Sequence, residues 1–535
     1  MRTEVNHMND ELVKIAEDSA RGGFFLISGT ALATAVMSIA AVLVGRFIGS
    51  ELYGQYTLVI VIPELFFLFT DLGINQGITK FTADLNSKNE IGRLATMMKY
   101  ALVIKASVGF VIFAVTYVWA EVIASALLQR PDLAFYVRVA SVSVLFQVMF
   151  AVATSAFVGF DKTEYNALTT NVQAFVKTVV SITLVLLGFS VAGAVLGYVA
   201  SYVVAATVGG LILLLFLSKR RVPEKHHDVK KDLRVLMNYG TPLYVSVLLT
   251  GLIPLYSKIV LANFVTDTEI GNYKQALNFA TLMTVLSIPI TTALLPAFSK
   301  LDLSANQKIK TFFKLANKYT AMLIIPVTVL IIVYSSEIVQ IILGSEYQLA
   351  GSFLATQSLV YFLVGIGYIT LAGFYNGLGE TKTTMIIGVI TFSTLGVLCP
   401  ILVQAFKVQG AIMAFLIAST AGTVYGMITA RKKFGVEYDT LSLLKIYSIS
   451  LISAIPSVLM LVFLPLPRLA NFVVGSVLYL LIYATLAPIT RIVTMPELEM
   501  AERITQKINL LSFIAKPILK YERRVLQWST KHREN

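Results

Sequence analysis

The stretch LVGRFIGSELYGQY (residues 43–56) aligns without a gap on VLANFVTDTEIGNY (residues 260–273). The difference in residue number between aligned positions, such as 43 and 260, is constant, and we call it the repeat offset. Three aligned positions are identical, pairing Phe47 with Phe264, Gly54 with Gly271 and Tyr56 with Tyr273. The same offset aligns VAGAVLGYVAS (191–201) on VQGAIMAFLIA (408–418). The constant offset indicates an internal duplication, and duplicated blocks of membrane helices are typical of transporters whose pathway lies between two lobes.

The composition is that of a membrane protein. Hydrophobic residues make up 56% of the 535 residues and charged residues only 14%, with a mean hydropathy of +0.77. Soluble domains carry about 25% charged residues. Runs of about 20 apolar residues recur along the chain, and each is long enough to cross a bilayer as a helix. We therefore predict an all-α, polytopic membrane protein.

We predict about fourteen transmembrane helices, arranged as two six-helix lobes in a parallel pseudo-twofold repeat followed by two C-terminal helices. The lobes are expected at 23–218 and 239–435, and the last two helices within 446–490. The individual spans are predicted at 23–45, 55–72, 99–120, 134–159, 168–189, 192–218, 239–262, 275–298, 319–342, 352–378, 383–405, 410–430, 446–463 and 470–490.

The distribution of basic residues predicts the orientation. With an even number of spans, 33 of the 43 lysines and arginines fall on the side of the two termini and 5 on the opposite side. The positive-inside rule therefore predicts a protein of the cytoplasmic membrane with both termini in the cytoplasm. On that side lie segment 1–22, a basic linker (219–238) and a tail (491–535) that we expect to form an amphipathic helix on the membrane surface.

The sequence contains no recognisable catalytic motif. It has no phosphate-binding glycine loop with a lysine, no nucleophile elbow and no metal-ligand spacing, so we predict neither an enzyme nor a bound cofactor or metal. The single cysteine, Cys399, excludes an internal disulfide. The net charge of +13 follows the topology. We interpret KRRVPEKHHDVKK (219–231) as a linker near anionic headgroups rather than a nucleic-acid site.

Charged residues inside the predicted spans are candidates for function, because burying a charge in a bilayer is costly. Glu64 lies in the middle of the second span, and Lys177 lies about nine residues into the fifth, near the bilayer midplane. One hypothesis places Lys177 at a central cavity, where its ammonium group attracts an anion. The other pairs Glu64 with Lys177 inside the first lobe, and the sequence does not separate the two.

Five further charged residues lie near the ends of spans or in the loop after the second span. Lys105 and Lys258 lie near the ends of the third and seventh spans, where their ammonium groups can snorkel to the interface or line a wet cavity between the lobes. Arg46 ends the first span and is expected to cap that helix. Asp71 and Lys80 flank a glycine-containing turn. For Arg46, Asp71 and Lys80 we favour a structural role over substrate contact or gating.

Several motifs in one order resemble a known family. They are GRFIGSELYGQY, TDLGINQGITKF, IGNYKQALNFA, LLPAFSKL, GSEYQLAG (344–351) and FYNGLGETKT (374–383). Together they resemble the polysaccharide-exporting flippases of the multidrug/oligosaccharidyl-lipid/polysaccharide (MOP) exporter superfamily, over nearly the whole chain. The resemblance implies alternating access from a V-shaped cavity. It also implies a cargo of oligosaccharide linked through diphosphate to a polyprenyl carrier and moved from the inner to the outer leaflet.

The resemblance also bears on the site and the partners. A cationic cavity would suit the phosphates of such a cargo, with Lys177, Lys258 and Lys105 as candidates. Many relatives carry an aspartate before the lysine-like position of the seventh span, but here Ser257 precedes Lys258, so a coupling role for that acid does not transfer. The expected partners are a polyprenyl-linked oligosaccharide and membrane lipids. A coupling cation and glycosyltransferases or a polymerase are further candidates, and no nucleic acid is expected.

Three alternatives to this function remain open. They are a lipid II flippase, a cation-coupled multidrug exporter of the same superfamily, and a non-transporting scaffold for glycan assembly. The first span has no ionisable residue before Arg46, and the seventh has Lys258 but no carboxylate. Both facts favour an anionic, lipid-linked cargo over a cationic drug.

Overall fold

The computed structural model describes residues 2–218, 229–281, 283, 306–495, 498–499, 516–517 and 519–528. Within these ranges the chain forms helices and no β-strand. The longer helices are α1 (Arg2–Leu68), α2 (Ile74–Ser87), α3 (Ile91–Val118), α4 (Ala120–Leu128), α5 (Ala134–Gly159), α6 (Thr163–Leu184), α7 (Ser190–Ser218), α8 (Val229–Ala262), α10 (Asn306–Val333), α11 (Ser335–Leu343), α12 (Ala350–Ser358), α13 (Thr370–Gly377), α14 (Thr381–Phe434), α15 (Thr440–Phe463) and α16 (Arg468–Ile489). Short helical turns are η1 (Pro131–Leu133), η2 (Val185–Phe189), η3 (Ser345–Tyr347) and η4 (Leu359–Ile366), and residues 267–281 form a helix without a label.

The helices confirm the predicted polytopic membrane fold. In the described part of the chain, 9 helical segments are long and apolar enough to span a membrane. A tenth is a broken span, Ala350–Ile366 with Thr370–Gly377, bent by 45°. Three of the nine, Gly29–Leu68, Thr163–Ser218 and Thr381–Phe434, each cover two predicted spans. The count of fourteen stays a prediction, because most of the span expected at 275–298 lies outside the described residues.

Two of the segments that cover two predicted spans, Thr163–Ser218 and Thr381–Phe434, turn at equivalent positions of the sequence repeat. Ser190 has φ 45° and ψ −124°, and Lys407, its counterpart at the repeat offset, has φ 53° and ψ −132°. Both residues lie where the sequence predicts a very short loop between two spans. Non-glycine residues rarely adopt this backbone conformation. The shared conformation therefore shows that the duplication extends from sequence to local backbone geometry.

We expect Ser190→Gly to stabilise the protein by about 1 kcal/mol. Glycine relieves backbone strain of roughly 1–3 kcal/mol, and this gain exceeds the entropic cost of ordering the more flexible glycine on folding. Thermal unfolding of the purified protein in detergent measures this effect. Ser141→Gly, inside α5, is the matched control and should destabilise the protein, since glycine weakens a helix interior. A lower unfolding temperature for Ser190→Gly than for the wild type would contradict the strain argument.

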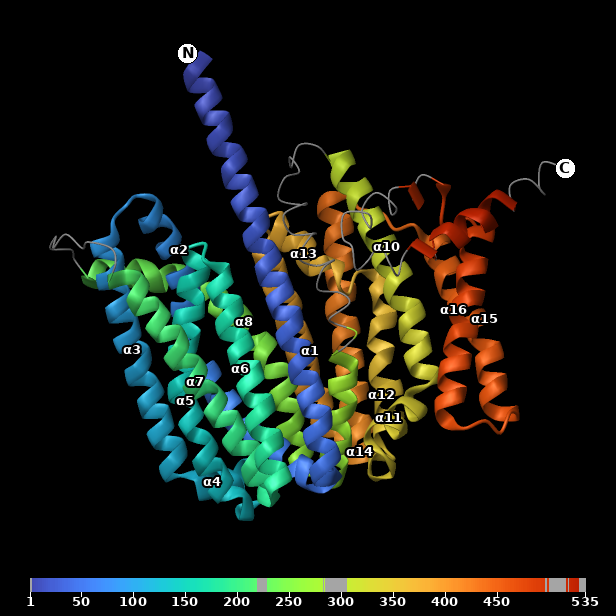
Figure 1. Cartoon of the computed structure of the whole chain (residues 1–535), viewed down its shortest axis with the longest axis horizontal. Helices are drawn as coiled ribbons and strands as arrows, with labels where there is room; N and C mark the ends of the chain where they lie inside the picture. Colours follow the sequence, from blue (N-terminus) through green and yellow to red (C-terminus); the bar gives the residue numbers. More distant parts are fainter. Residues whose placement is uncertain are drawn as a thin grey trace. The chain divides into compact units, whose positions relative to one another are not determined.

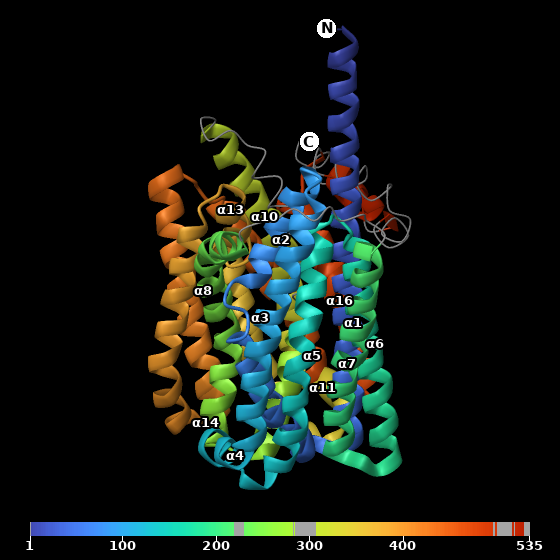
Figure 2. The same cartoon turned by 90° about the vertical axis from the view of Figure 1, so that its left-hand side faces the viewer.

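The described chain forms two compact units. Unit 1 comprises residues 1–289 with 384–418, and unit 2 comprises 290–383 with 419–535. In unit 1, α3, α5, α6 and α7 run alongside one another, with α1 against α6 (Figures 1 and 2). Glycines let helices of this unit approach closely. A Cβ on Gly197 of α7 would overlap Ser181 of α6, and one on Gly159 of α5 would approach the Thr79 backbone of α2.

Unit 2 contains α10 packed against η4 and α15, with α15 and α16 side by side (Figure 1). The backbone groups freed by the broken helix near Gly365 find side-chain partners. Asn317 Nδ2 donates to the Gly365 carbonyl at 2.6 Å, and the Gly365 amide donates to Tyr447 Oη at 3.2 Å. Irregular backbone at membrane depth needs such partners, because lipid offers none.

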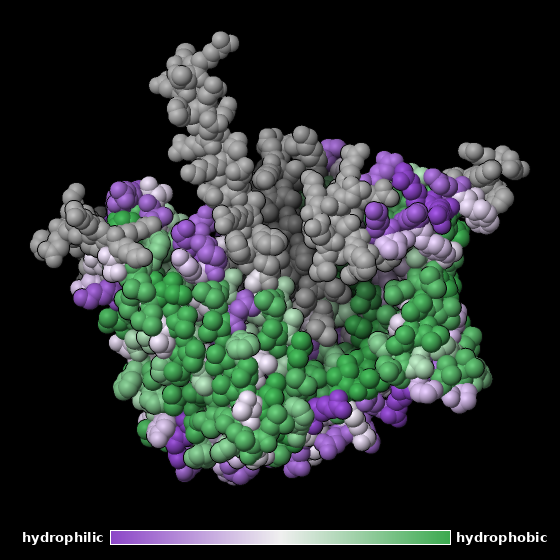
Figure 3. Space-filling view, viewed as in Figure 1, coloured by the Kyte–Doolittle hydropathy of each residue, from purple (hydrophilic) through white to green (hydrophobic). Residues whose placement is uncertain are grey.

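The surface of the unit 1 helices is predominantly apolar. On the face shown in Figure 3, hydrophobic residues cover the middle of the helices and hydrophilic residues gather toward their ends. Large exposed side chains such as Phe110 and Phe175, which would be anomalous in water, belong to this apolar surface. They are accounted for by contact with lipid hydrocarbon.

The predicted polar segments are only partly described. Helix α8 begins at Val229, so the stretch 229–238 of the predicted linker is helical, and residues 219–228 lie outside the described residues. The sequence VKKDLRVL carries no glycine or proline, and it therefore allows the helix to continue beyond the apolar span. Most of the predicted tail helix also lies outside the described residues, although 519–528 are helical.

Candidate functional site

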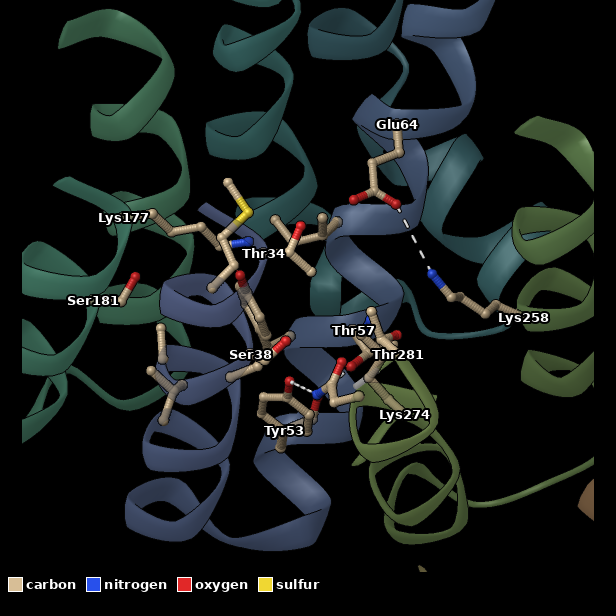
Figure 4. A pocket seen from close by; sticks show the side chains of 17 residues that line it. Thr34, Ser38, Tyr53, Thr57, Glu64, Lys177, Ser181, Lys258, Lys274 and Thr281 are labelled. Atoms are coloured by element: carbon tan, nitrogen blue, oxygen red, sulfur yellow. Dashed lines mark hydrogen bonds and ion pairs between the residues drawn. The ribbon is translucent and has the colours of Figure 1, made fainter. Parts of the chain in front are cut away.

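Unit 1 contains a cavity of about 250 Å³ lined by α1, α6, α8 and helix 267–281 (Figure 4). Among the described residues, four charged side chains line it: Glu64, Lys177, Lys258 and Lys274. Three are cationic and one is anionic, so the cavity carries an excess of positive charge. Its remaining polar lining is neutral and includes Tyr53 and Asn278.

Lys177 enters the cavity from α6, on the opposite side from Lys258 (Figure 4). Its Nζ lies 5.2 Å from the centre of the Tyr198 ring, within cation–π range. Within the described chain no carboxylate lies within 4.0 Å of Lys177 Nζ. The aromatic ring therefore supports the ammonium group without neutralising it.

Glu64 and Lys258 face one another across the cavity wall. Lys258 Nζ lies 3.9 Å from Glu64 Oε2, and the Glu64 side chain is 39% exposed. This separation exceeds hydrogen-bond length, so the contact is an ion pair without a close hydrogen bond. The alternative pairing of Glu64 with Lys177 that the sequence left open is therefore not the ion pair formed in this structure.

Lys274 is a cavity residue that the sequence prediction missed. The span boundaries placed it in a loop one residue before the eighth span, but the structure places it inside helix 267–281. The repeat offers a signal that would have found it. At the repeat offset Thr57 pairs with Lys274 and Glu64 pairs with Thr281, and all four residues line the cavity.

Neutral hydrogen bonds fix the cavity wall that bears Lys274. Asn278 Nδ2 donates to Tyr53 Oη at 2.9 Å and to Gln275 Oε1 at 3.1 Å. Gln275 Nε2 donates to the Ala41 carbonyl at 2.8 Å. The bonds to Tyr53 and Ala41 join α1 of the first repeat to helix 267–281 of the second. Lys274 therefore lies on a helix that is held in place against α1.

Close contacts to backbone carbonyls join the two repeats at both ends of the cavity along α1. At one end, a Cβ on Gly54 would overlap the Asp267 carbonyl oxygen, and one on Gly271 would overlap that of Ser50. These two contacts are reciprocal, because the two glycines are counterparts at the repeat offset and so are the two carbonyls. Beyond Glu64, toward the other end, Tyr244 Oη donates to the Leu68 carbonyl at 2.9 Å.

Arg130 adds an ion pair at the Gly54 end. Its Nε lies 2.9 Å from Asp267 Oδ1, and its Nη2 donates to the Val265 carbonyl at 3.0 Å. Both side chains are largely buried, at 23% and 12% exposure. Arg130 therefore clamps the loop before η1 in the first repeat onto the turn before helix 267–281 in the second.

We expect Arg130→Met to loosen this end and to speed labelling of a cysteine introduced at Thr281 several-fold, in a Cys399→Ala background. A membrane-impermeant thiol reagent applied to each side of oriented vesicles measures the labelling rate. Arg138→Met is the matched control, because Arg138 pairs with the exposed Glu121 and makes no ion pair to the second repeat within the described chain. Equal labelling rates in both variants would contradict the clamp.

Lys105 lies outside the cavity lining, in a buried ion pair. Its Nζ is 3.3 Å from Asp71 Oδ1 and 2.6 Å from Asn75 Oδ1, and its side chain is fully buried. Asp71 Oδ1 also accepts from the Asn75 amide at 3.1 Å. The cluster therefore ties α3 to the turn before α2, where Gly73 packs against Gly240. Lys105 does not enter the substrate proposal below.

The other two candidates lie at exposed positions. Arg46 lies in α1, three residues before the non-helical Gly49, and Lys80 lies in α2 with its Nζ 5.6 Å from the Phe81 ring. Neither side chain lines the described cavity. The structural roles expected for both remain predictions.

The chemistry of the cavity is that of an anion-binding site. Lysine ammonium groups form short charge-assisted hydrogen bonds to phosphate oxygens. Three of them converge on one space, with hydroxyl and amide groups able to donate or accept beside them. The described residues hold no group of three histidine, cysteine, aspartate or glutamate side chains placed to bind a metal ion.

The model of one protein family matches residues 19–302, which is more than half of the chain and includes the whole cavity lining described above. That family is described as polysaccharide biosynthesis protein. The chain therefore belongs to the polysaccharide biosynthesis protein family. The match confirms the relationship inferred from the motifs.

Among curated proteins, the chain is 24% identical over 470 residues to the lipid II flippase MurJ of Bacillus subtilis (strain 168), covering 79% of this chain and 84% of the relative. Solved structures share its fold. A lipid II flippase MurJ in an inward closed conformation matches with a TM-score of 0.71 and 16% identity, over 87% of this chain and 98% of that one. A multidrug resistance MATE family transporter of the MOP superfamily matches with a TM-score of 0.61 and 16% identity, over 75% and 94%. The fold is therefore that of MOP-superfamily transporters.

Proposed function

We propose that this protein is a flippase of the cytoplasmic membrane. It moves an oligosaccharide, linked through diphosphate to a polyprenyl carrier, across the bilayer by alternating access for cell-surface polysaccharide or glycan assembly. The observation that carries the proposal is the convergence of Lys177, Lys258 and Lys274 on one intramembrane cavity. A triple cationic site within a bilayer is costly unless an anion occupies it during function.

The same charge argues against a multidrug exporter for cations. Such a cargo would meet three ammonium groups and one carboxylate, and like charges in a site of low dielectric repel strongly. The same positive charge attracts the diphosphate of a lipid-linked cargo. Lipid II, the cargo in the names of two similar proteins, belongs to the same chemical class and is the second candidate substrate.

Unit 2 contains an apolar groove of its own. An apolar groove of about 460 Å³ runs between α10, η4 and α15, lined by residues such as Val329, Phe362 and Ile455. Its lining is almost wholly apolar and suits a prenyl chain rather than a sugar. The proposal assigns the diphosphate of the cargo to the lysine cavity of unit 1.

The proposal includes the orientation predicted from the basic residues. Both termini lie in the cytoplasm, as the asymmetry of lysine and arginine supports. On that side the cargo would be received from the glycosyltransferases that build it. A polymerase or another assembly enzyme would take it up on the other side.

Ligand-dependent thermal stability tests the assignment of cargo class. A ligand that binds only the folded state raises the unfolding temperature in proportion to its occupancy. We expect a polyprenyl-diphosphate sugar to raise it, and a lipophilic quaternary ammonium compound at the same concentration to leave it unchanged. Stabilisation by the cation alone would overturn the proposal in favour of a multidrug exporter.

A further inference from the structure

Glu64 is the one carboxylate among the described residues that line the cavity, and its position is unusual for a structural ion pair. A carboxylate that served only to neutralise a buried lysine would form close hydrogen bonds to it. Here the gap to Lys258 is 3.9 Å, and more than a third of the Glu64 side chain remains exposed. The carboxylate therefore faces the cavity as well as the lysine (Figure 4).

The Glu64 charge acts on more than one lysine. It forms an ion pair with Lys258 and lines the same cavity as Lys177 and Lys274. Glu64 thus lies within the field of all three ammonium groups that would hold an anionic cargo. An entering phosphate must share this field with the carboxylate or displace it.

The charges balance in a way that points to one headgroup chemistry. Three lysines and one glutamate leave two positive charges without a partner in the cavity. A diphosphate that joins a lipid to a sugar is a diester, and each of its two phosphates carries one negative charge. A lipid-linked monophosphate sugar carries only one. With the three lysines protonated and Glu64 ionised, the charge of the cavity matches that of the diphosphate.

We propose that Glu64 is an internal counter-ion that the cargo displaces from Lys258 and that reclaims this lysine when the cargo leaves. This inference rests on the proposed function and adds how the same site releases its substrate. Glu64 does not bind the cargo; it is a positioning residue that acts through Lys258.

The physical need for such a group is release. A flippase must bind its cargo on one side and let it go on the other, so very tight binding would slow the cycle. Three unpaired ammonium groups in a bilayer would hold a diphosphate strongly, because leaving them bare is costly. A carboxylate on the same wall lowers that cost in the empty state. It therefore weakens binding and speeds release.

The test replaces Glu64 by glutamine, which keeps the shape and removes the charge. We expect Glu64→Gln to bind a polyprenyl-diphosphate sugar about tenfold more tightly than the wild type, since the carboxylate no longer competes with the phosphates for Lys258. Its maximal rate of flipping in vesicles should fall several-fold because release slows. Glu64→Asp, which restores the charge, should recover the maximal rate in part.

A second background shows whether Glu64 acts through Lys258. In Lys258→Met protein, the further change Glu64→Gln should alter affinity much less than it does in the wild type, because the lysine it competes for is absent. Folded yield of every variant is recorded beside the rates. Tighter binding with slower turnover is a result that loss of structure does not produce.

Three outcomes overturn the inference: weaker binding in Glu64→Gln, unchanged affinity and rate, or the same effect with and without Lys258. These outcomes are distinguishable from failure of the proposed function. If wild-type protein neither binds nor flips the diphosphate lipid, the function itself is wrong. If wild-type protein flips it and Glu64→Gln behaves identically, only the counter-ion role is wrong.

Discussion

Lys177→Met is expected to reduce flipping of a diphosphate-linked glycan by about one to two orders of magnitude, the range that loss of one charge-assisted hydrogen bond to phosphate produces. The folded protein should survive the change. Among the described residues Lys177 is within ion-pair distance of no carboxylate, so its removal leaves no buried charge without its ion-pair partner. A methionine can also pack on the Tyr198 ring that Lys177 now contacts.

Two matched variants accompany this prediction. Lys177→Arg keeps the charge and changes the hydrogen-bond geometry, so it should retain partial activity. Ser181→Ala removes a neutral polar group one helical turn away in the same cavity and should flip at close to the wild-type rate. The rates are measured in vesicles and compared with folded yield. Full flipping by Lys177→Met would remove this lysine from the site.

Gly54→Ala is expected to destabilise the protein by roughly 1–3 kcal/mol, the usual cost of forcing an extra methyl group into a packed interface. The added Cβ would overlap the Asp267 carbonyl oxygen, which is backbone and cannot rotate away. Gly271→Ala should have a similar effect, since its Cβ would overlap the Ser50 carbonyl at the equivalent position of the repeat. Thermal unfolding in detergent measures both.

Gly210→Ala is the control for the steric argument. Gly210 lies in α7, where an added Cβ meets no atom within 4 Å, and alanine favours a helix more than glycine does. This variant should therefore unfold at or above the wild-type temperature. If Gly54→Ala and Gly210→Ala behaved alike, the reciprocal glycine contacts would not hold the two repeats together.

The fold could be predicted from the sequence because its determinants are periodic or repeated. Long apolar runs locate the helices, and the constant repeat offset aligns the two repeats, including the turns at Ser190 and Lys407. Both signals survive small errors in helix boundaries. The sequence predicts loops within α1 and α14, whereas each is one long helix interrupted by a non-helical residue. A short loop and a kink leave the same pattern in the sequence, so the two could not be told apart.

The site could be predicted only in part. Lys177, Lys258 and Glu64 stand out because charges are rare within apolar spans, and the structure places all three around one cavity. Lys274 was assigned to a loop because a helix boundary was misplaced. Lys105 also lies within a predicted span, but its partner Asp71 is far from it in the chain, before α2. Such pairing depends on tertiary packing and leaves no local pattern.

Reconstituted flipping tests the central claim most directly. Purified protein is placed in vesicles with a fluorescent polyprenyl-diphosphate oligosaccharide in one leaflet, and its appearance in the other leaflet is followed. The account predicts protein-dependent translocation of the diphosphate lipid, much slower translocation by Lys177→Met, and no uptake of lipophilic cations. Translocation of cations without the diphosphate lipid, or of neither, would contradict it.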